Sequence, residues 1–306
     1  MRKRKSFTLI ELLVVIVIIG ILAGVIMVST SSSISKANLA KAQSFCSIVN
    51  NELLLNLVSE WTFDEGPTSS GLATNNDVKD LWGSNNGDIT SHAPNILTRS
   101  DCIFNKCLQF LGSTSYVTYG DSDSLDIENA ITITAWIKTT STAQQLIIQK
   151  SANSTHVDPW RLYALLVTPE SSILKARLSL STGVAGTQIQ LKGNTNVSLN
   201  EWHYIVGTWS GGKNAKIYLD GKDDNLAGLS FTGPIGINNE PLRMANVPIN
   251  GERFYGNIDD ARLYNRALSL SEIKQKYIAG LDSLLAKKSI SKEDYNQRIS
   301  ELAYEK

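Results

Sequence analysis

Hydrophobic and polar positions follow three different patterns along the chain. From Phe7 to Val28 the residues are almost all apolar, and Glu11 is the only charged side chain. This stretch has no polar face, and it is long enough to cross a bilayer as a helix. From residue 34 to residue 56 apolar positions recur near one helical face, which predicts an amphipathic continuation of the helix to about Asn56.

From residue 58 onward the pattern changes to short runs in which apolar and polar positions alternate. The run from Ile131 to Lys138 is one example, and its period of two is typical of half-buried strands. The turn-forming pairs Gly211-Gly212 and Asp220-Gly221 each follow such a run and predict two hairpins. Many short strands of this kind predict a β-sandwich or barrel.

Helical signals return near the C-terminus. Ser269 and Glu272 have the spacing of a capping box, which predicts a helix that runs to about Ala279 and ends at Gly280. The charged segment 281–306 lacks Trp, Gly and Pro, and a second cap at Ser291 predicts a helical hairpin. The fold class is therefore mainly β: a long N-terminal transmembrane and amphipathic helix, an antiparallel β-sandwich and a short C-terminal helical tail.

Composition and charge narrow the class of partner. Hydrophobic residues make up 42% of the chain, which excludes wholesale disorder. The 29 basic and 29 acidic side chains balance, so no electrostatic footprint for nucleic acid is present. Cys102 and Cys107 have four residues between them, and outside the membrane we expect a local disulfide.

The apolar N-terminal stretch has three simple interpretations: a cleaved secretory signal, an uncleaved anchor, or a buried helix. The stretch is too long for a usual cleaved signal, and a helix apolar on every face rarely belongs to a soluble core. The basic residues 2–5 should stay on the cytoplasmic side. Glu11 does not suit a plain anchor, because a carboxylate inside a bilayer is costly and is normally kept for a function or partner.

The run Lys5–Ile16 closely resembles the class III signal of type IV prepilins and pseudopilins. The resemblance implies that a prepilin peptidase cleaves between Ser6 and Phe7 and methylates Phe7. It also implies that Glu11 neutralises the N-terminal amine of a neighbouring subunit during assembly, which pairs the buried charge. The family usually has Gly before the cleavage site where this chain has Ser6, so the efficiency of cleavage stays open. Residues 1–6 are then the leader, and residues 7–56 the pilin-type helix, with about 7–28 in the membrane.

Seven motifs, in order, resemble the laminin-G-like, concanavalin A-like jelly-roll domains. They are Trp61–Gly66, Asp80–Gly87, Cys107–Gly112, Thr134–Ile137, Trp202–Tyr204, Tyr218–Gly221 and Gly256–Ser269. The resemblance implies two antiparallel sheets within residues 58–280, often with a structural calcium and sometimes with a glycan or protein ligand. By the family pattern Asp80 and Asp260 are the candidate calcium ligands, since calcium needs several hard oxygen donors. The alternative is that Asp80 caps a turn and Asp260 pairs with Arg262.

Catalysis and binding make different demands on such a domain. Glycosidases of this superfamily need two carboxylates facing each other across a cleft. The adjacent pairs Asp64-Glu65 and Asp259-Asp260 would point to opposite faces of a strand, so we expect no enzyme. A binding module uses exposed aromatic rings instead. Trp82 and Trp160 lie in turn-rich surroundings and are the candidates, whereas we assign the remaining motif tryptophans to the core: Trp61, Trp136 and Trp202.

The sequence as a whole indicates a minor pilin or pseudopilin that displays a jelly-roll domain on a cell-surface filament. The expected partners are the bacterial inner membrane, other pilin subunits, the prepilin peptidase and an extracellular glycan or protein. The C-terminal domain then lies outside the cytoplasm. A membrane-anchored lectin-like protein that never polymerises is the alternative, and a glycoside hydrolase is a third. The segment 281–306 weakly resembles the short helix pair called SHOCT, and it either docks a partner or packs on its own domain.

Overall fold

The computed structural model describes residues 56–65, 77–90, 95–97, 102–112, 116–153, 155, 157–225, 229–246 and 251–303. Residues 56–306 form one compact unit. Ser6, Phe7, Glu11 and the predicted pilin-type helix lie outside the described residues. Within the described ranges, no helix is both long enough and apolar enough to span a bilayer.

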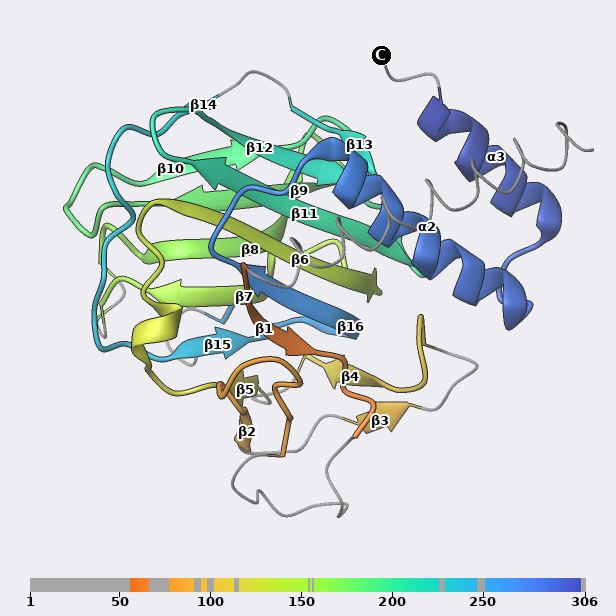
Figure 1. Cartoon of the computed structure of the whole chain (residues 1–306), viewed down its shortest axis with the longest axis horizontal. Coiled ribbons are helices and arrows are strands. Elements are labelled where there is room, and N and C mark those ends of the chain that lie inside the picture. The colour runs from red at the N-terminus through yellow and green to blue at the C-terminus, as the bar shows by residue number, and fades with distance from the viewer. Residues whose placement is uncertain are drawn as a thin grey trace, which may run out of the picture. The chain divides into compact units, whose positions relative to one another are not determined.

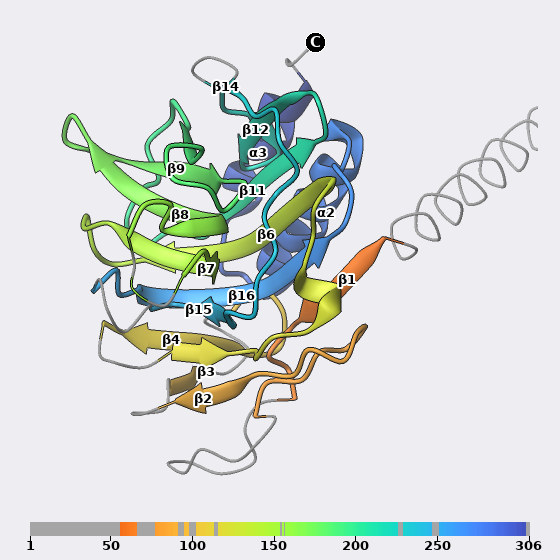
Figure 2. The same ribbon diagram turned by 90° about the vertical axis from the view of Figure 1, so that its left-hand side faces the viewer.

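The described residues form two antiparallel sheets that pack face to face, as the alternating pattern predicts (Figure 1, Figure 2). The nine-stranded sheet contains β1 (Leu57–Trp61), β3 (Asn95–Leu97), β4 (Cys107–Leu111), β6 (Ala130–Thr139), β11 (His203–Ser210), β12 (Asn214–Leu219), β13 (Lys222–Asp223), β14 (Leu229–Ser230) and β16 (Tyr255–Tyr264). The seven-stranded sheet contains β2 (Asp88–Thr90), β5 (Tyr116–Thr118), β7 (Gln145–Ser151), β8 (Arg161–Glu170), β9 (Ile173–Leu180), β10 (Ile189–Lys192) and β15 (Leu242–Met244).

The core lies between the two sheets. Alternate residues of β6 and β11, such as Ile133 and Ile205, pack there against Leu165 and Leu178 of the opposite sheet, and all four are fully buried. Both predicted hairpins are confirmed, because β11 pairs with β12 and β12 pairs with β13. Burial of this apolar surface stabilises the sandwich.

The outer face of β6 is buried as well, because α2 (Leu270–Ala286) lies across the nine-stranded sheet (Figure 1). Trp136 points outward from β6 and stacks on Tyr277 of α2, with ring centroids 5.5 Å apart. The capping box at Ser269 and Glu272 is confirmed. The predicted end of the helix at Gly280 is wrong, since α2 passes through this residue and continues to Ala286. A Cβ atom at Gly280 would lie 2.1 Å from the ring of Trp136, so the glycine allows close packing.

The C-terminal segment packs on its own domain. A turn after α2 leads to α3 (Lys292–Ala303), whose first turn is capped by the Ser291 hydroxyl, 3.0 Å from the backbone N–H of Asp294. Leu302 of α3 is buried, and Lys222 of β13 forms an ion pair of 2.7 Å with Glu301. Of the two predicted roles for the tail, the structure shows packing on the jelly roll.

Candidate functional site

A cavity of about 500 Å³ lies where β1 begins, between the loop that follows Asp80 and the loop before β6. We call it the Trp82 pocket, because the indole of Trp82 forms part of its wall and is 46% exposed. The first two residues of β1, Leu57 and Val58, form another part. The polar lining residues are Asp123, Ser124, Asp126, Glu128, Asn129 and Asn265.

Asp80 holds the Trp82 loop in shape. Its Oδ1 atom accepts hydrogen bonds from the backbone N–H groups of Glu60, Trp82 and Gly83, at 2.9, 3.1 and 2.9 Å. Its Oδ2 atom accepts from the N–H of Asn85 at 3.0 Å. Four backbone donors therefore converge on one carboxylate, which is how an aspartate caps a turn. Asp80 thus positions the exposed tryptophan.

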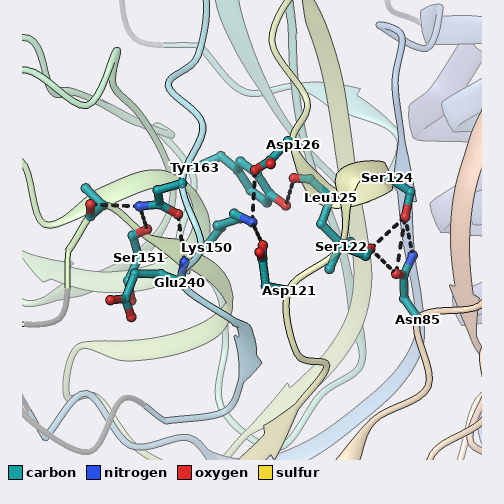
Figure 3. A network of polar contacts seen from close by, with 12 residues as sticks. Asn85, Asp121, Ser122, Ser124, Leu125, Asp126, Lys150, Ser151, Tyr163 and Glu240 are labelled. Atoms are coloured by element: carbon teal, nitrogen blue, oxygen red, sulfur yellow. Dashed lines mark hydrogen bonds and ion pairs between the residues drawn. The ribbon is translucent and has the colours of Figure 1, made fainter.

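The opposite wall is fastened to the same loop by a small hydroxyl and amide network (Figure 3). The side-chain amide of Asn85 donates to the Ser124 hydroxyl at 3.0 Å. The Ser122 hydroxyl donates back to the Asn85 Oδ1 atom at 2.6 Å. These bonds tie the wall at residues 122–124 to the Trp82 loop.

A buried lysine holds this wall from the other side (Figure 3). The Nζ atom of Lys150, on β7, lies 2.5 Å from Asp121 and 3.0 Å from Asp126. The Tyr163 hydroxyl donates to the carbonyl of Leu125 at 2.8 Å. Burial, followed by the charges of Asp126 and Asp121, raises the pKa of Tyr163 well above its ordinary value, so the hydroxyl keeps its proton and stays a donor. The pocket wall is therefore preorganised.

The Trp82 pocket combines an exposed aromatic ring with carboxylates and side-chain amides. No lysine or arginine lines the pocket among the described residues, and Asp123 and Glu128 add negative charge. This charge disfavours an anionic ligand. An indole face packs on the apolar face of a sugar ring, while carboxylates and amides accept or donate hydrogen bonds to its hydroxyls. The geometry fits a neutral saccharide.

The two candidate calcium ligands do not form a calcium-binding donor set. Both oxygens of Asp80 are occupied by backbone N–H groups, and Asp260 lies buried 2.8 Å from the Nη2 atom of Arg262. In the described ranges, no group of three or more His, Cys, Asp or Glu side chains is placed to hold a metal ion. Calcium needs several free oxygen donors, so these two residues fit the capping and ion-pairing alternatives. Calcium binding stays a prediction.

Asp259, another carboxylate considered in the sequence, supports the loop that the disulfide closes. Cys102 and Cys107 form the expected disulfide, with Cα atoms 5.5 Å apart. Asp259 is buried and accepts the N–H groups of Ile103 and Phe104 at 2.8 and 3.0 Å. Burial is the main cause that raises the pKa of Asp259 well above its ordinary value. Neither this residue nor Asp260 lines the Trp82 pocket.

Exposure of the tryptophans follows the prediction. Trp82 and Trp160 are 46% and 43% exposed, whereas Trp61, Trp136 and Trp202 are buried. Trp160 lies outside the Trp82 pocket. Sequence reasoning did not identify the carboxylates of the opposite wall. The density of acidic residues between Asp121 and Glu128 was the available signal.

A Ser–His–Asp chain also went unpredicted. The Ser198 hydroxyl lies 2.8 Å from Nε2 of His203, whose Nδ1 atom lies 2.7 Å from Asp220. Burial lowers the pKa of His203, but the charge and hydrogen bond of Asp220 outweigh this effect and raise it overall. The two hydrogen bonds of His203 connect the start of β11 to the turn after β12.

Two antiparallel sheets with a preorganised polar pocket define a lectin-like jelly-roll protein. Residues 111–274 match the model of the concanavalin A-like lectin/glucanases superfamily, and the chain belongs to this superfamily. Residues 1–27 match the prokaryotic N-terminal methylation motif, which is the type IV prepilin signal. No protein with a curated description matches the chain.

Solved structures with the same fold include toxin binding domains. The binding domain of Paraclostridial Mosquitocidal Protein 1 is 18% identical, with a TM-score of 0.53 over 75% of this chain and 53% of that one. A structure of botulinum neurotoxin type C, which interacts with two ganglioside molecules, is 14% identical, with a TM-score of 0.52 over 75% and 52%. The chain spans about half the length of these structures, and at this identity the likeness shows the fold.

Proposed function

We propose that this chain is a pilin-like subunit that is cleaved by a prepilin peptidase after Ser6 and methylated on Phe7. The N-terminal helix then assembles into a cell-surface filament or pseudopilus, with Glu11 opposite the amine of a neighbouring subunit. The jelly-roll domain is displayed outside the cell and binds a neutral glycan. The protein then functions by assembling into the filament and by displaying its jelly-roll domain.

The N-terminal methylation motif at residues 1–27 supports the assembly half of this proposal. The observation that carries the binding half is the Trp82 pocket. Its indole is nearly half exposed, yet the loop that carries it is fixed by Asp80 and Asn85. A fixed aromatic face loses little entropy on binding, which favours a ligand-binding role.

A membrane-anchored lectin-like protein that does not polymerise is the second candidate. Ser6 is the observation that favours it, because the family usually has Gly before the cleavage site. Mass spectrometry of the N-terminal peptide from the membrane-extracted chain separates the two. Methylated Phe7 as the first residue supports the pilin-like subunit. A peptide that still contains Arg2 to Ser6 contradicts it and supports the anchor.

We further propose that the domain binds its ligand without turning it over. Of the three carboxylates of the pocket, Asp126 is paired with Lys150 at 3.0 Å, and Asp123 and Glu128 lie on the same wall, in the segment between β5 and β6. A glycosidase needs one free acid and one free base or nucleophile on opposite sides of the scissile bond. Release of reducing sugar from a bound glycan would contradict this part of the proposal.

The binding half is tested by a glycan array probed with the full chain in detergent micelles. Trp82→Ala removes the stacking surface and should weaken binding of neutral glycans about fivefold or more, since an aromatic contact is worth about 1–3 kcal/mol. Trp160→Ala is the matched control, because Trp160 is equally exposed and lies outside the pocket. Equal loss in both variants, or no loss in Trp82→Ala, excludes the Trp82 pocket as the site.

A further inference from the structure

Four exposed apolar side chains gather at the end of the sandwich where β7 and β9 end. They are Val157, Trp160, Val184 and Ile237, with exposed fractions between 43% and 63%. They make up half of the large apolar side chains that are exposed in the described part of the chain. We call them the end cluster. Exposed apolar side chains that are scattered singly need no explanation, but a group of them marks an interaction surface.

The end cluster is carried by three loops, and two of these are joined directly by hydrogen bonds. The first two residues lie between β7 and β8, and the third lies between β9 and β10. The N–H of Trp160 donates to the side chain of Gln188 at 2.9 Å. The N–H of Gly186 donates to the carboxylate of Asp158 at 2.6 Å. Both bonds connect the β7–β8 loop to the β9–β10 loop.

The segment between β14 and β15 carries Ile237 and joins both other loops. It runs along the side of the domain that is turned to the viewer in Figure 2. The N–H of Gly236 donates to the carbonyl of Ser181 at 3.0 Å. The side-chain amide of Asn238 donates to the carbonyl of Ala152 at 2.7 Å. The four apolar side chains therefore lie on one framework of linked loops.

The end cluster lies at the same end of the domain as the Trp82 pocket. The N–H of Ile235, two residues before Ile237, donates at 2.8 Å to the carbonyl of Glu128, which lines that pocket. The four side chains of the cluster do not line the pocket themselves. A partner that covers the cluster therefore lies beside the pocket and leaves it as a separate site.

The loops of the end cluster offer little for a charged partner to bind. Residues 157–160, 181–188 and 231–241 contain no Lys or Arg and two carboxylates, those of Asp158 and Glu240. Asp158 already accepts the N–H of Gly186. Without basic side chains these loops do not attract an anionic surface, so the gain on docking comes from the burial of apolar area.

The size and the residue types of the end cluster favour a bilayer over a second protein. Four side chains of this kind expose a few hundred Å², whereas each partner of a stable protein interface buries about 800 Å². A bilayer sets no such threshold, because each apolar side chain that enters it contributes separately. An indole beside aliphatic side chains is also typical of segments at the boundary between headgroups and acyl chains.

We propose that the end cluster docks this domain on a zwitterionic phospholipid bilayer, with its four side chains inserted at the level of the headgroups. The bilayer is a second membrane, distinct from the one that holds the predicted N-terminal helix. This choice rests on the proposed display of the domain on a cell-surface filament. Docking brings the Trp82 pocket to the same lipid surface.

Tryptophan fluorescence tests this docking in the full chain. All six Trp residues lie after residue 56, so the predicted N-terminal helix contributes no signal. The chain is reconstituted into ordinary phosphatidylcholine vesicles, and an excess of vesicles of brominated phosphatidylcholine, a contact quencher, is added. We expect quenching that grows with the added vesicles. Trp160→Phe should lose most of it, because this variant removes the indole of the end cluster.

Val184→Asp and Leu111→Asp are the matched pair of variants. The two native side chains are 63% and 64% exposed, but Leu111 lies at the opposite end of the domain, paired with Tyr255 at the start of β16. Val184→Asp should raise the vesicle concentration for half of the quenching about tenfold, which is the loss expected when one valine is no longer buried. Leu111→Asp should leave this concentration unchanged, and melting temperatures show that both variants fold.

The proposal is overturned if the added vesicles cause no quenching, or if both aspartate variants have the same effect. Quenching that persists in Trp160→Phe and disappears in Trp82→Phe overturns the assignment to the end cluster. Quenching that occurs only when the chain itself is reconstituted into brominated vesicles shows contact with its own membrane and overturns the choice of a second one. No step needs a glycan or an assembled filament, so failure of the proposed function and failure of this docking are distinguishable.

Discussion

At the scale of single residues, Asp80 shows how one side chain can organise a surface loop. The sequence left two roles open for this residue, a calcium ligand or a turn cap. The structure places four backbone N–H groups on its carboxylate, and these include the N–H of the exposed Trp82. Residue type alone does not separate the two roles, because both need a carboxylate in a loop. The direction of the neighbouring N–H groups separates them.

Asp80→Ala should lower the free energy of unfolding by about 2–4 kcal/mol, because it removes the acceptor of four backbone N–H groups, of which one makes a buried hydrogen bond and three make part-buried ones. Glycan binding at the Trp82 pocket should weaken in parallel, since the loop loses its cap. Urea denaturation and the glycan array measure the two effects. Asp223→Ala, which breaks an exposed pair with Lys216, is the control and should cost less than about 1 kcal/mol. Equal stability of the two variants would contradict the assigned role of Asp80.

His203 makes the stability of the domain depend on pH. Asp220 raises the pKa of His203 above its ordinary value in the folded chain. The pair therefore contributes its full stabilisation below the pKa of the unfolded chain, about 6.5, and loses it as the pH rises through the folded pKa.

Urea denaturation between pH 5.5 and 8.5 should show the free energy of unfolding falling over this interval. The Asp220→Asn variant should show a smaller fall, because the neutral amide no longer favours the charged imidazole. A wild-type curve whose pH dependence matches that of the variant excludes the pair as its source.

At the scale of elements, the strands and turns were predictable and the length of α2 was not. Alternation and turn residues are local signals, so the run from Ile131 to Lys138 and both hairpins appear where the sequence predicts them. The end of a helix at Gly280 is also a local prediction. It fails because Trp136, far away in the chain, needs space at that position. Tertiary packing here decides the role of a glycine that local rules assign to a helix end.

Gly280→Ala tests this packing. Alanine favours helix by about 1 kcal/mol, but its Cβ atom would overlap the Trp136 ring, so we expect a net loss of about 1–3 kcal/mol in the free energy of unfolding. Thermal denaturation of the full chain in micelles measures the loss. Ala279→Ser on the exposed side of α2 is the control and should change stability by less than about 0.5 kcal/mol. A Gly280→Ala variant that is more stable than the wild-type chain would mean that the Trp136 ring does not require a glycine at this position.

At the scale of the whole molecule, the candidate sites were only partly predictable. The sequence singled out Trp82 and the tail helices, but it could not bring Lys150 beside Asp121 and Asp126. Those placements depend on the pairing of strands that are distant in sequence. The signal at residues 5–16, in contrast, is read as a linear motif, and it was recognisable from the sequence alone.

Glu11→Ala is the prediction that belongs to this scale. If the helices assemble as proposed, the variant should reach the membrane, while filaments recovered by shearing should fall at least tenfold, since the N-terminal amine loses its partner. Immunoblots of sheared and membrane fractions measure both amounts. Glycan binding by the extracted variant should stay unchanged, which separates assembly from ligand binding. Normal filament yield from Glu11→Ala supports the non-polymerising anchor.

The position of the Trp82 pocket has a mechanical consequence. Leu57 and Val58 form part of its wall, and they are also the first residues of β1, directly after the segment predicted to build the shaft. If residues 7–56 build the shaft and the pocket holds a ligand as proposed, a pull on that ligand reaches the shaft through a few residues of the chain. The ladder between β1 and β16 anchors those residues to the nine-stranded sheet. The force that such a subunit withstands under flow then depends on the short segment around β1. It depends much less on the force that unfolds the whole domain.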